Sequence, residues 1–131
     1  MRFVLVDQVL EQDSERLTAV KAVTAAEEYL GDHFPGFPVL PGVMMLEALV
    51  QAGRRWIDGQ ATDAAAQGPY ALENVRNVRY GQMVRPGQSL RVEVRLRKRD
   101  ALRFEFDGTG SVDGETAVQG RFVLSPASTL V

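Results

Sequence analysis

The chain has 131 residues, a length typical of one domain with a single hydrophobic core. Its 15 Lys and Arg residues against 17 Asp and Glu residues leave a net charge of −2, which excludes a strongly basic nucleic-acid-binding protein. The absence of cysteine excludes disulfides, thiolate nucleophiles and cysteine-ligated metals. We therefore expect one domain over residues 1–131, with no nucleic-acid partner.

No segment is typical of a signal peptide or of a membrane helix. The N-terminal apolar stretch is interrupted by Asp7 and is not followed by a small-residue cleavage site. The longest other apolar run, around Val39 to Val50, contains Pro41 and Glu47 and is too short to span a bilayer. We therefore expect a cytoplasmic protein without membrane contact.

The first part of the chain predicts a hairpin followed by a short helix. Phe3 to Leu10 predicts a strand, and Arg16 to Val23 alternates with a two-residue period, so these two segments are expected to pair. Thr24 and Glu27 have capping-box spacing and Gly31 supplies a stop, which predicts a helix of one to two turns.

One long helix is predicted in the middle of the chain. Prolines in residues 32–40 favour a stiff loop, after which Pro41 suits the first helical position and Gly59 the end of the helix. Apolar residues cover nearly its whole circumference, which is typical of a buried helix. Glu47 and Gln51, four residues apart, form the only polar stripe of its first three turns.

The second half of the chain alternates with the period of β-strands. Arg85-Pro86-Gly87 and Asp113-Gly114 have the composition of tight turns. The predicted strands are Tyr70 to Tyr80, Leu90 to Leu96, Leu102 to Phe106 and Thr116 to Leu124. The expected fold class is α+β, with an antiparallel sheet packed on one long helix.

The segment around the helix start combines three groups suited to one kind of chemistry. His33 is the only histidine and can act as a base near neutral pH. Gly42 supplies the first free N–H of the helix, where a developing oxyanion is stabilised. Apolar surroundings on the helix would favour the protonated form of Glu47, as a general acid requires, and Gln51 can orient its carboxyl group. Such a set can remove a proton α to a carbonyl and expel a β-hydroxyl group.

Residues 33–43 read HFPGFPVLPGV and residues 47–51 read EALVQ. This stretch closely resembles the hallmark of the β-hydroxyacyl-ACP dehydratases of bacterial type II fatty acid synthesis, which have the hotdog fold. The resemblance extends from Phe3 to Gly114 and so covers most of the chain. It implies an antiparallel sheet wrapped around one long central helix.

The same resemblance implies a role for each site residue. His33 and Glu47 match the catalytic pair, and the Gly42 amide matches the group that binds the thioester oxygen. The carbonyl of Val39 matches the one that fixes the histidine, and Gln51 remains a candidate for orienting Glu47. The resemblance also implies that His33 of one subunit faces Glu47 of the other across a homodimer interface, beside a tunnel for the acyl chain.

The implied reaction is dehydration of a (3R)-3-hydroxyacyl-ACP to the trans-2-enoyl-ACP by a hydro-lyase. Glu rather than Asp at position 47 resembles the dehydratase-only branch, so no isomerisation is expected. No cofactor and no metal are expected, the partner is acyl carrier protein, and a trimer of dimers is left open beyond the dimer. The sequence departs from the family pattern at four positions, which are Asp32, Phe37, Arg54 and Arg55.

Other interpretations remain open at this stage. The fold also supports hotdog thioesterases and acyl-binding subunits without turnover. Taken alone, His33 could be a loop histidine, and Glu47 a solvent-facing residue on a face shared with Gln51 and with Arg54 or Arg55. The arginines between positions 91 and 103 could form a basic patch for the carrier protein, although the carboxylates among them favour a face of mixed charge.

Overall fold

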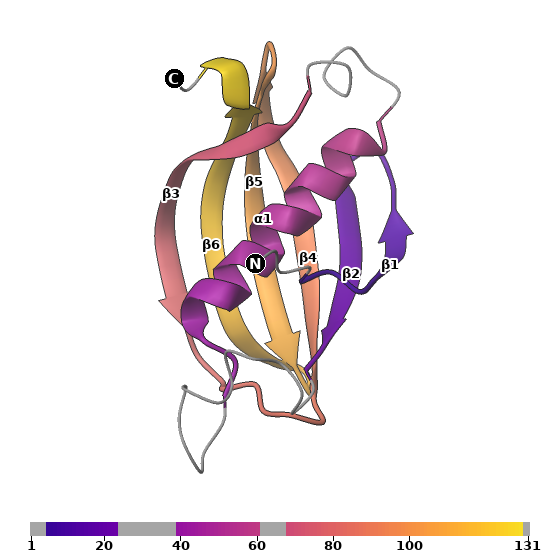
Figure 1. Cartoon of the computed structure of the whole chain (residues 1–131), viewed down its shortest axis with the longest axis vertical. Coiled ribbons are helices and arrows are strands. Elements are labelled where there is room, and N and C mark those ends of the chain that lie inside the picture. Colours follow the sequence, from indigo (N-terminus) through magenta and orange to yellow (C-terminus); the bar gives the residue numbers. More distant parts are fainter. Residues whose placement is uncertain (1–4, 24–38, 61–67, 130–131) are drawn as a thin grey trace.

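A computed structural model describes residues 5–23, 39–60 and 68–129. These residues form a six-stranded antiparallel sheet that curves around one helix (Figure 1). The elements in chain order are β1 (Gln8–Gln12), β2 (Arg16–Ala22), α1 (Gly42–Asp58), β3 (Tyr70–Tyr80), β4 (Ser89–Asp100), β5 (Arg103–Val112), β6 (Glu115–Pro126) and a 3-10 turn, Ala127–Thr129. The predicted α+β arrangement is confirmed.

The strands lie in the order β1-β2-β4-β5-β6-β3, so β1 and β3 are the two edges of the sheet. Asp113 and Gly114 join β5 to β6 with φ angles of 50° and 80°, as a primed hairpin turn requires. Gly87 follows Pro86 with a φ of 93°, which suits a turn with proline at its second position. Both predicted turns are therefore confirmed.

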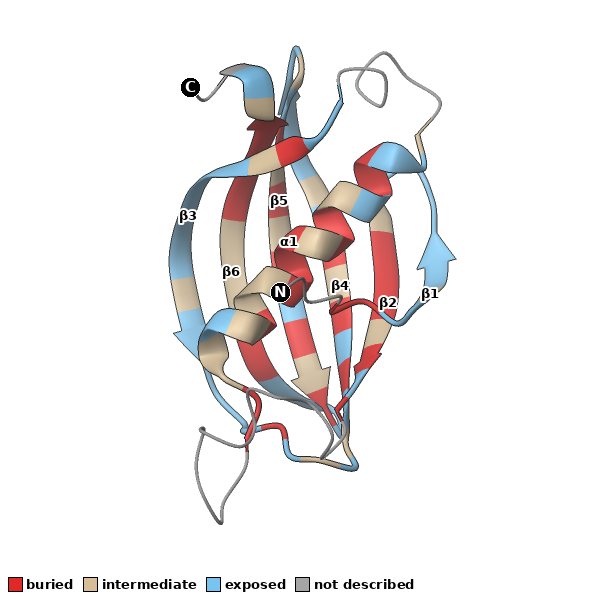
Figure 2. Cartoon of the chain, viewed as in Figure 1, coloured by how far each residue is buried: buried red, intermediate tan, exposed pale blue. Residues whose placement is uncertain are grey.

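The hydrophobic core lies between α1 and the concave face of the sheet, where buried positions alternate along β4 and β5 (Figure 2). The Phe106 ring lies 5.7 Å from Trp56 on the helix and 5.4 Å from Phe122 on β6, centroid to centroid. A Cβ atom on Gly53 would lie 2.9 Å from the Phe122 ring, so glycine permits the close approach of α1 to β6. Met45 and Trp56 are buried in this core.

Two predicted boundaries differ from the structure. The strand predicted from Phe3 begins only at Gln8, because the N–H of Leu5 donates to the Gln51 side chain, 2.7 Å away, rather than to a neighbouring strand. Pro41 is the N-cap residue rather than the first helical one, with a ψ of 143°. The helix predicted over residues 24–30 lies outside the described residues.

The prediction that α1 is buried all round is wrong for the single chain. Its buried residues face the sheet, whereas the side chain of Val43 points outward and Val43 is 69% exposed. The sheet covers one side of the helix, and apolar composition alone does not reveal which side remains open.

Replacement of Phe106 by Ala should lower the free energy of unfolding by about 3–5 kcal/mol, because a fully buried ring in contact with three other aromatic rings is removed. Urea denaturation followed by circular dichroism measures this change. Thr109→Ala, at an exposed position of the same strand, should cost less than about 1 kcal/mol. Equal losses in both variants would contradict this packing.

Candidate functional site

The start of α1 presents backbone donors that the helix itself does not use. The N–H groups of Met44 and Met45 both donate to the carbonyl of Pro41, at 3.0 and 3.1 Å. The N–H groups of Gly42 and Val43 donate to none of the described residues. Because unpaired N–H groups at a helix N-terminus stabilise negative charge, this end of α1 can hold a carbonyl oxygen that becomes an oxyanion.

The position of Gly42 leaves no room for a larger residue without movement of a neighbour. A Cβ atom there would lie 2.9 Å from Cε1 of Tyr80, the last residue of β3. Tyr80 is itself about half exposed, so its ring forms part of the accessible surface beside the helix start. The preceding turn is anchored by the N–H of Leu40, which donates to the carbonyl of Val84 at 2.8 Å.

The Glu47 carboxylate lies on a polar stripe of α1. Nε2 of Gln51 donates to Oε1 of Glu47 at 3.4 Å. Oε1 of Gln51 accepts from the N–H of Leu5 at 2.7 Å, so the amide is held from its other end. The predicted role of Gln51 as the group that orients Glu47 therefore has a hydrogen bond to support it.

A third side chain, Arg54, completes this stripe. Its Nη1 lies 3.4 Å from Oε1 of Glu47, and the two side chains are 36% and 39% exposed, respectively. Its Nε donates to the carbonyl of Tyr70 at 2.9 Å. The apolar surroundings predicted for Glu47 are therefore not found in the single chain, because its nearest neighbours along the helix face are an amide and a guanidinium group.

The structure brings only part of the predicted site together. Gly42, Glu47 and Gln51 lie on one helix, and Val39 is buried just before it. His33 lies outside the described residues. No pattern in the sequence predicts the contacts of Leu5, Tyr80 or Tyr70. The contact between Glu47 and Arg54 does have a signal in the sequence, because the two residues are seven positions apart and residues two helical turns apart share a face.

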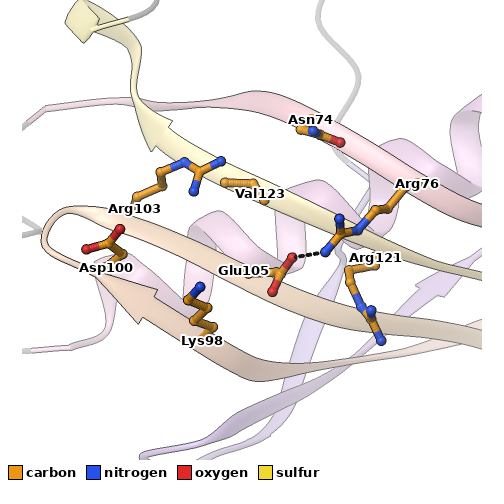
Figure 3. A pocket seen from close by; sticks show the side chains of 8 residues that line it. All are labelled: Asn74, Arg76, Lys98, Asp100, Arg103, Glu105, Arg121 and Val123. Carbon is orange, nitrogen blue, oxygen red and sulfur yellow. Dashed lines mark hydrogen bonds and ion pairs between the residues drawn. The ribbon is translucent and has the colours of Figure 1, made fainter.

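A hollow lies on the face of the sheet opposite to α1. It has a volume of about 250 Å³ and is lined by eight residues of β3, β4, β5 and β6, with α1 behind the sheet (Figure 3). Arg76 and Arg97 both pair with Glu105, at 2.7 and 3.4 Å. At the same end of the sheet, the Arg103 guanidinium is hydrogen-bonded to the Glu73 carboxyl and lowers its pKa.

These ion pairs support the interpretation of this face as a surface of mixed charge. Arg97 and Arg121 pair with carboxylates of β5, the strand next to their own, whereas the pairs of Arg76 and Arg103 reach across β6. The hollow also lacks the helix start and the Glu47 stripe, which lie on the other side of the sheet. We therefore place the candidate active site at α1.

The described residues contain neither a cluster of metal ligands nor a membrane helix. No three His, Cys, Asp or Glu residues among them lie close enough to hold a metal ion. Within the same ranges, no helix has both the length and the apolar character needed to cross a membrane.

The fold and the site residues define the class to which the chain belongs. The family model for the FabA-like domain matches residues 1–121, and the chain is a member of this family. A 3-hydroxyacyl-(acyl-carrier-protein) dehydratase FabZ from Solibacter usitatus is 38% identical over 125 residues, which cover 95% of this chain and 76% of that protein. The predicted relationship to the dehydratases is thereby confirmed.

Solved structures show that the fold is shared more widely. The dehydratase heterocomplex ApeI:P from Xenorhabdus doucetiae matches 94% of this chain and 82% of the compared chain, with a TM-score of 0.72 and 21% identity. A mutant thioesterase, PA1618 from Pseudomonas aeruginosa, matches 88% of this chain and 77% of its own, with a TM-score of 0.67 and 18% identity. These likenesses confirm the hotdog fold, and the fold alone does not distinguish the two activities.

Replacement of Gln51 by Leu should lower the free energy of unfolding by about 1–3 kcal/mol, because the buried N–H of Leu5 loses its acceptor. Urea denaturation gives this value. Gln119→Leu, on β6 and without a side-chain hydrogen bond to the described residues, is the matched control and should unfold near the wild-type midpoint. Unchanged stability of the Gln51 variant would show that the Leu5 contact contributes nothing.

Proposed function

We propose that this chain is a FabZ-type 3-hydroxyacyl-ACP dehydratase, which converts a (3R)-3-hydroxyacyl-ACP to the trans-2-enoyl-ACP and water in fatty acid or related acyl-chain biosynthesis. The observation that carries the proposal is the joint occurrence, on one helix, of a Gly42 N–H that donates to none of the described residues and the Gln51-bonded carboxyl of Glu47. The relative named FabZ, which is 38% identical over 95% of this chain, supports dehydration as the reaction that these groups carry out.

In the proposed mechanism, the substrate loses one proton and one hydroxyl group. His33 accepts the proton from the carbon next to the thioester carbonyl, and the electron pair moves toward the carbonyl oxygen. The N–H of Gly42 stabilises the negative charge that develops on this oxygen. Glu47 gives its proton to the β-hydroxyl group, which leaves as water. Transfer of one proton from His33 to Glu47 restores both groups, so no cofactor enters the balance.

Several finer points belong to the same proposal. The carbonyl of Val39 holds His33 in position, residues 1–131 act as one domain, and the protein works in the cytoplasm. Acyl carrier protein delivers the substrate, and the Glu at position 47 acts without subsequent isomerisation of the double bond. The roles of Val39, the carrier protein and Glu47 follow from the resemblance to the dehydratases of type II synthesis, whereas the single domain rests on the chain length and the cytoplasmic location on the targeting signals considered in the sequence.

We also propose that the active enzyme is a homodimer with shared sites. β3 is an edge strand of 11 residues, so its outer N–H and C=O groups can pair with another strand. Exposed apolar residues gather along β3 and at the nearby start of α1, where an interface would cover them. They are Val43, Leu72, Val75, Tyr80 and Met83. A second copy seated there can bring its His33 to Glu47.

His33→Ala and Glu47→Gln should each lower kcat by at least about a hundredfold while the fold remains intact, because each removes a proton-transfer group. Mass spectrometry of the protein incubated with 3-hydroxyacyl-ACP substrates of several chain lengths detects the loss of water, and circular dichroism checks the fold. Release of free acid instead would indicate a thioesterase. Binding without conversion would indicate an acyl-binding subunit.

Mixing the His33→Ala and Glu47→Gln proteins should restore activity if the sites are shared. Random exchange makes half of the dimers mixed, and each mixed dimer has one intact site of two, so activity should recover to about a quarter of the wild-type value. Sedimentation of the wild type measures its oligomeric state alongside. A mixture that exchanges subunits and stays inactive would place both residues of each site on one chain.

A further inference from the structure

Arg54 connects the carboxylate of Glu47 to the edge strand of the sheet. Its Nη1 lies 3.4 Å from Oε1 of Glu47, two helical turns earlier on α1, and its Nε donates to the carbonyl of Tyr70 at 2.9 Å. A planar guanidinium can make both contacts at once from one fixed geometry, whereas the single ammonium group of a lysine cannot reproduce that fork.

The carbonyl of Tyr70 is available because of its place in the β-ladder. The N–H of Ala127 donates to the carbonyl of Pro69 at 2.9 Å, and the next pair along the two strands is Tyr70 with Pro126. Hydrogen-bonded and non-hydrogen-bonded pairs alternate in an antiparallel ladder, so the Tyr70 carbonyl is directed away from β6, toward the open edge. Arg54 therefore binds an acceptor that β6 does not use.

The donors on Glu47 meet at one of its two oxygens. Gln51 and Arg54 both approach Oε1, each at 3.4 Å, and no donor among the described residues contacts Oε2. Amide and guanidinium nitrogens only donate, so an oxygen that accepts from both cannot carry the acidic proton toward them. In the protonated form of Glu47 the proton is therefore placed on Oε2.

Each donor is anchored to a different part of the fold. Gln51 is fixed by the N–H of Leu5, and Arg54 by the carbonyl of Tyr70. The carboxyl group is thus held between the segment before β1 and the first residue of β3, which lie on opposite sides of α1 (Figure 1). Such bracing limits rotation of the carboxyl group and keeps one oxygen directed to the reacting atoms.

Arg54 also introduces charge next to the proposed acid. Within the described ranges it is the one cation in ion-pair distance of Glu47, and the proposed function adds His33 as the other titratable group. Both side chains are partly exposed, so solvent screens the attraction between the two charges, and the contact acts mainly through its geometry.

We infer that Arg54 is a positioning residue for Glu47, which shares with Gln51 the hydrogen bonding of Oε1 and leaves the transferable proton on Oε2. This inference rests on the proposed function, because it assigns to Arg54 an effect on the acid of that reaction. It also makes a statement about the hydrogen bonding of the Glu47 carboxyl group that is measurable without turnover.

The kinetic test compares Arg54→Met with Arg55→Met. The control removes the same charge from the adjacent, exposed position, which makes no contact with Glu47. The substrate is a 3-hydroxyacyl pantetheine thioester, so altered docking of a carrier protein cannot imitate the effect. In Arg54→Met we expect kcat to fall roughly 3- to 30-fold with KM little changed. The kinetics of Arg55→Met should stay near the wild-type values.

Two further variants separate charge from geometry. Arg54→Lys keeps the charge but not the fork, so its kcat should remain reduced. Tyr70→Phe keeps the carbonyl that Arg54 binds and should retain the wild-type kinetics. An Arg54→Met enzyme with the kcat of Arg55→Met, or an Arg54→Lys enzyme with wild-type kcat, would overturn the inference.

A spectroscopic measurement keeps the inference independent of the proposed reaction. In protein labelled with carbon-13 at the glutamate carboxyl groups, the Glu47 resonance is identified by its loss in Glu47→Gln. Its chemical shift at neutral pH should change in Arg54→Met, which loses a hydrogen bond to Oε1, and stay unchanged in Arg55→Met. An unchanged chemical shift in both variants would overturn the inference, whereas full turnover by Glu47→Gln would overturn the proposed function instead.

Discussion

The packing of α1 against the sheet is the constraint on which the rest of the molecule depends. Gly53 allows the helix backbone to approach the Phe122 ring, and Trp56 packs against Phe106 on the neighbouring strand. Because each residue turns an α-helix by about 100°, these contacts fix the direction of every other side chain on α1. The stripe from Glu47 to Arg54 therefore faces the gap between β3 and the segment before β1.

The helix has two different tasks, and its sequence divides between them. One face fills the core, where a change of volume is costly, and the other carries Glu47 and, at its start, the N–H of Gly42, which donates to none of the described residues. A rigid support for the proposed acid and the proposed oxyanion donor comes from the same packing that stabilises the fold. The proposed base, His33, belongs to a different segment, so assembly of the full set depends on tertiary or quaternary structure.

The parts predicted from the sequence were those with local causes. The alternation of β4 and β5 and the Asp113-Gly114 turn follow from residues next to one another in the chain. The polar neighbours of Glu47 lie on its own helix at positions 51 and 54, whereas the extent to which other elements cover this face does not follow from the helix sequence. No local pattern shows that Arg54 donates to the Tyr70 carbonyl. The same holds for the Leu5 N–H, which donates to the Gln51 side chain before β1 begins at Gln8.

The anchors of Gln51 and Arg54 are backbone atoms, the N–H of Leu5 and the carbonyl of Tyr70. Any residue type other than proline supplies the first, and every residue type supplies the second. The bracing of the Glu47 carboxyl group therefore places no demand on residue identity at positions 5 and 70. Comparison of aligned sequences would treat both positions as ordinary hydrophobic sites, and only the three-dimensional structure reveals that their backbones hold Gln51 and Arg54 beside Glu47.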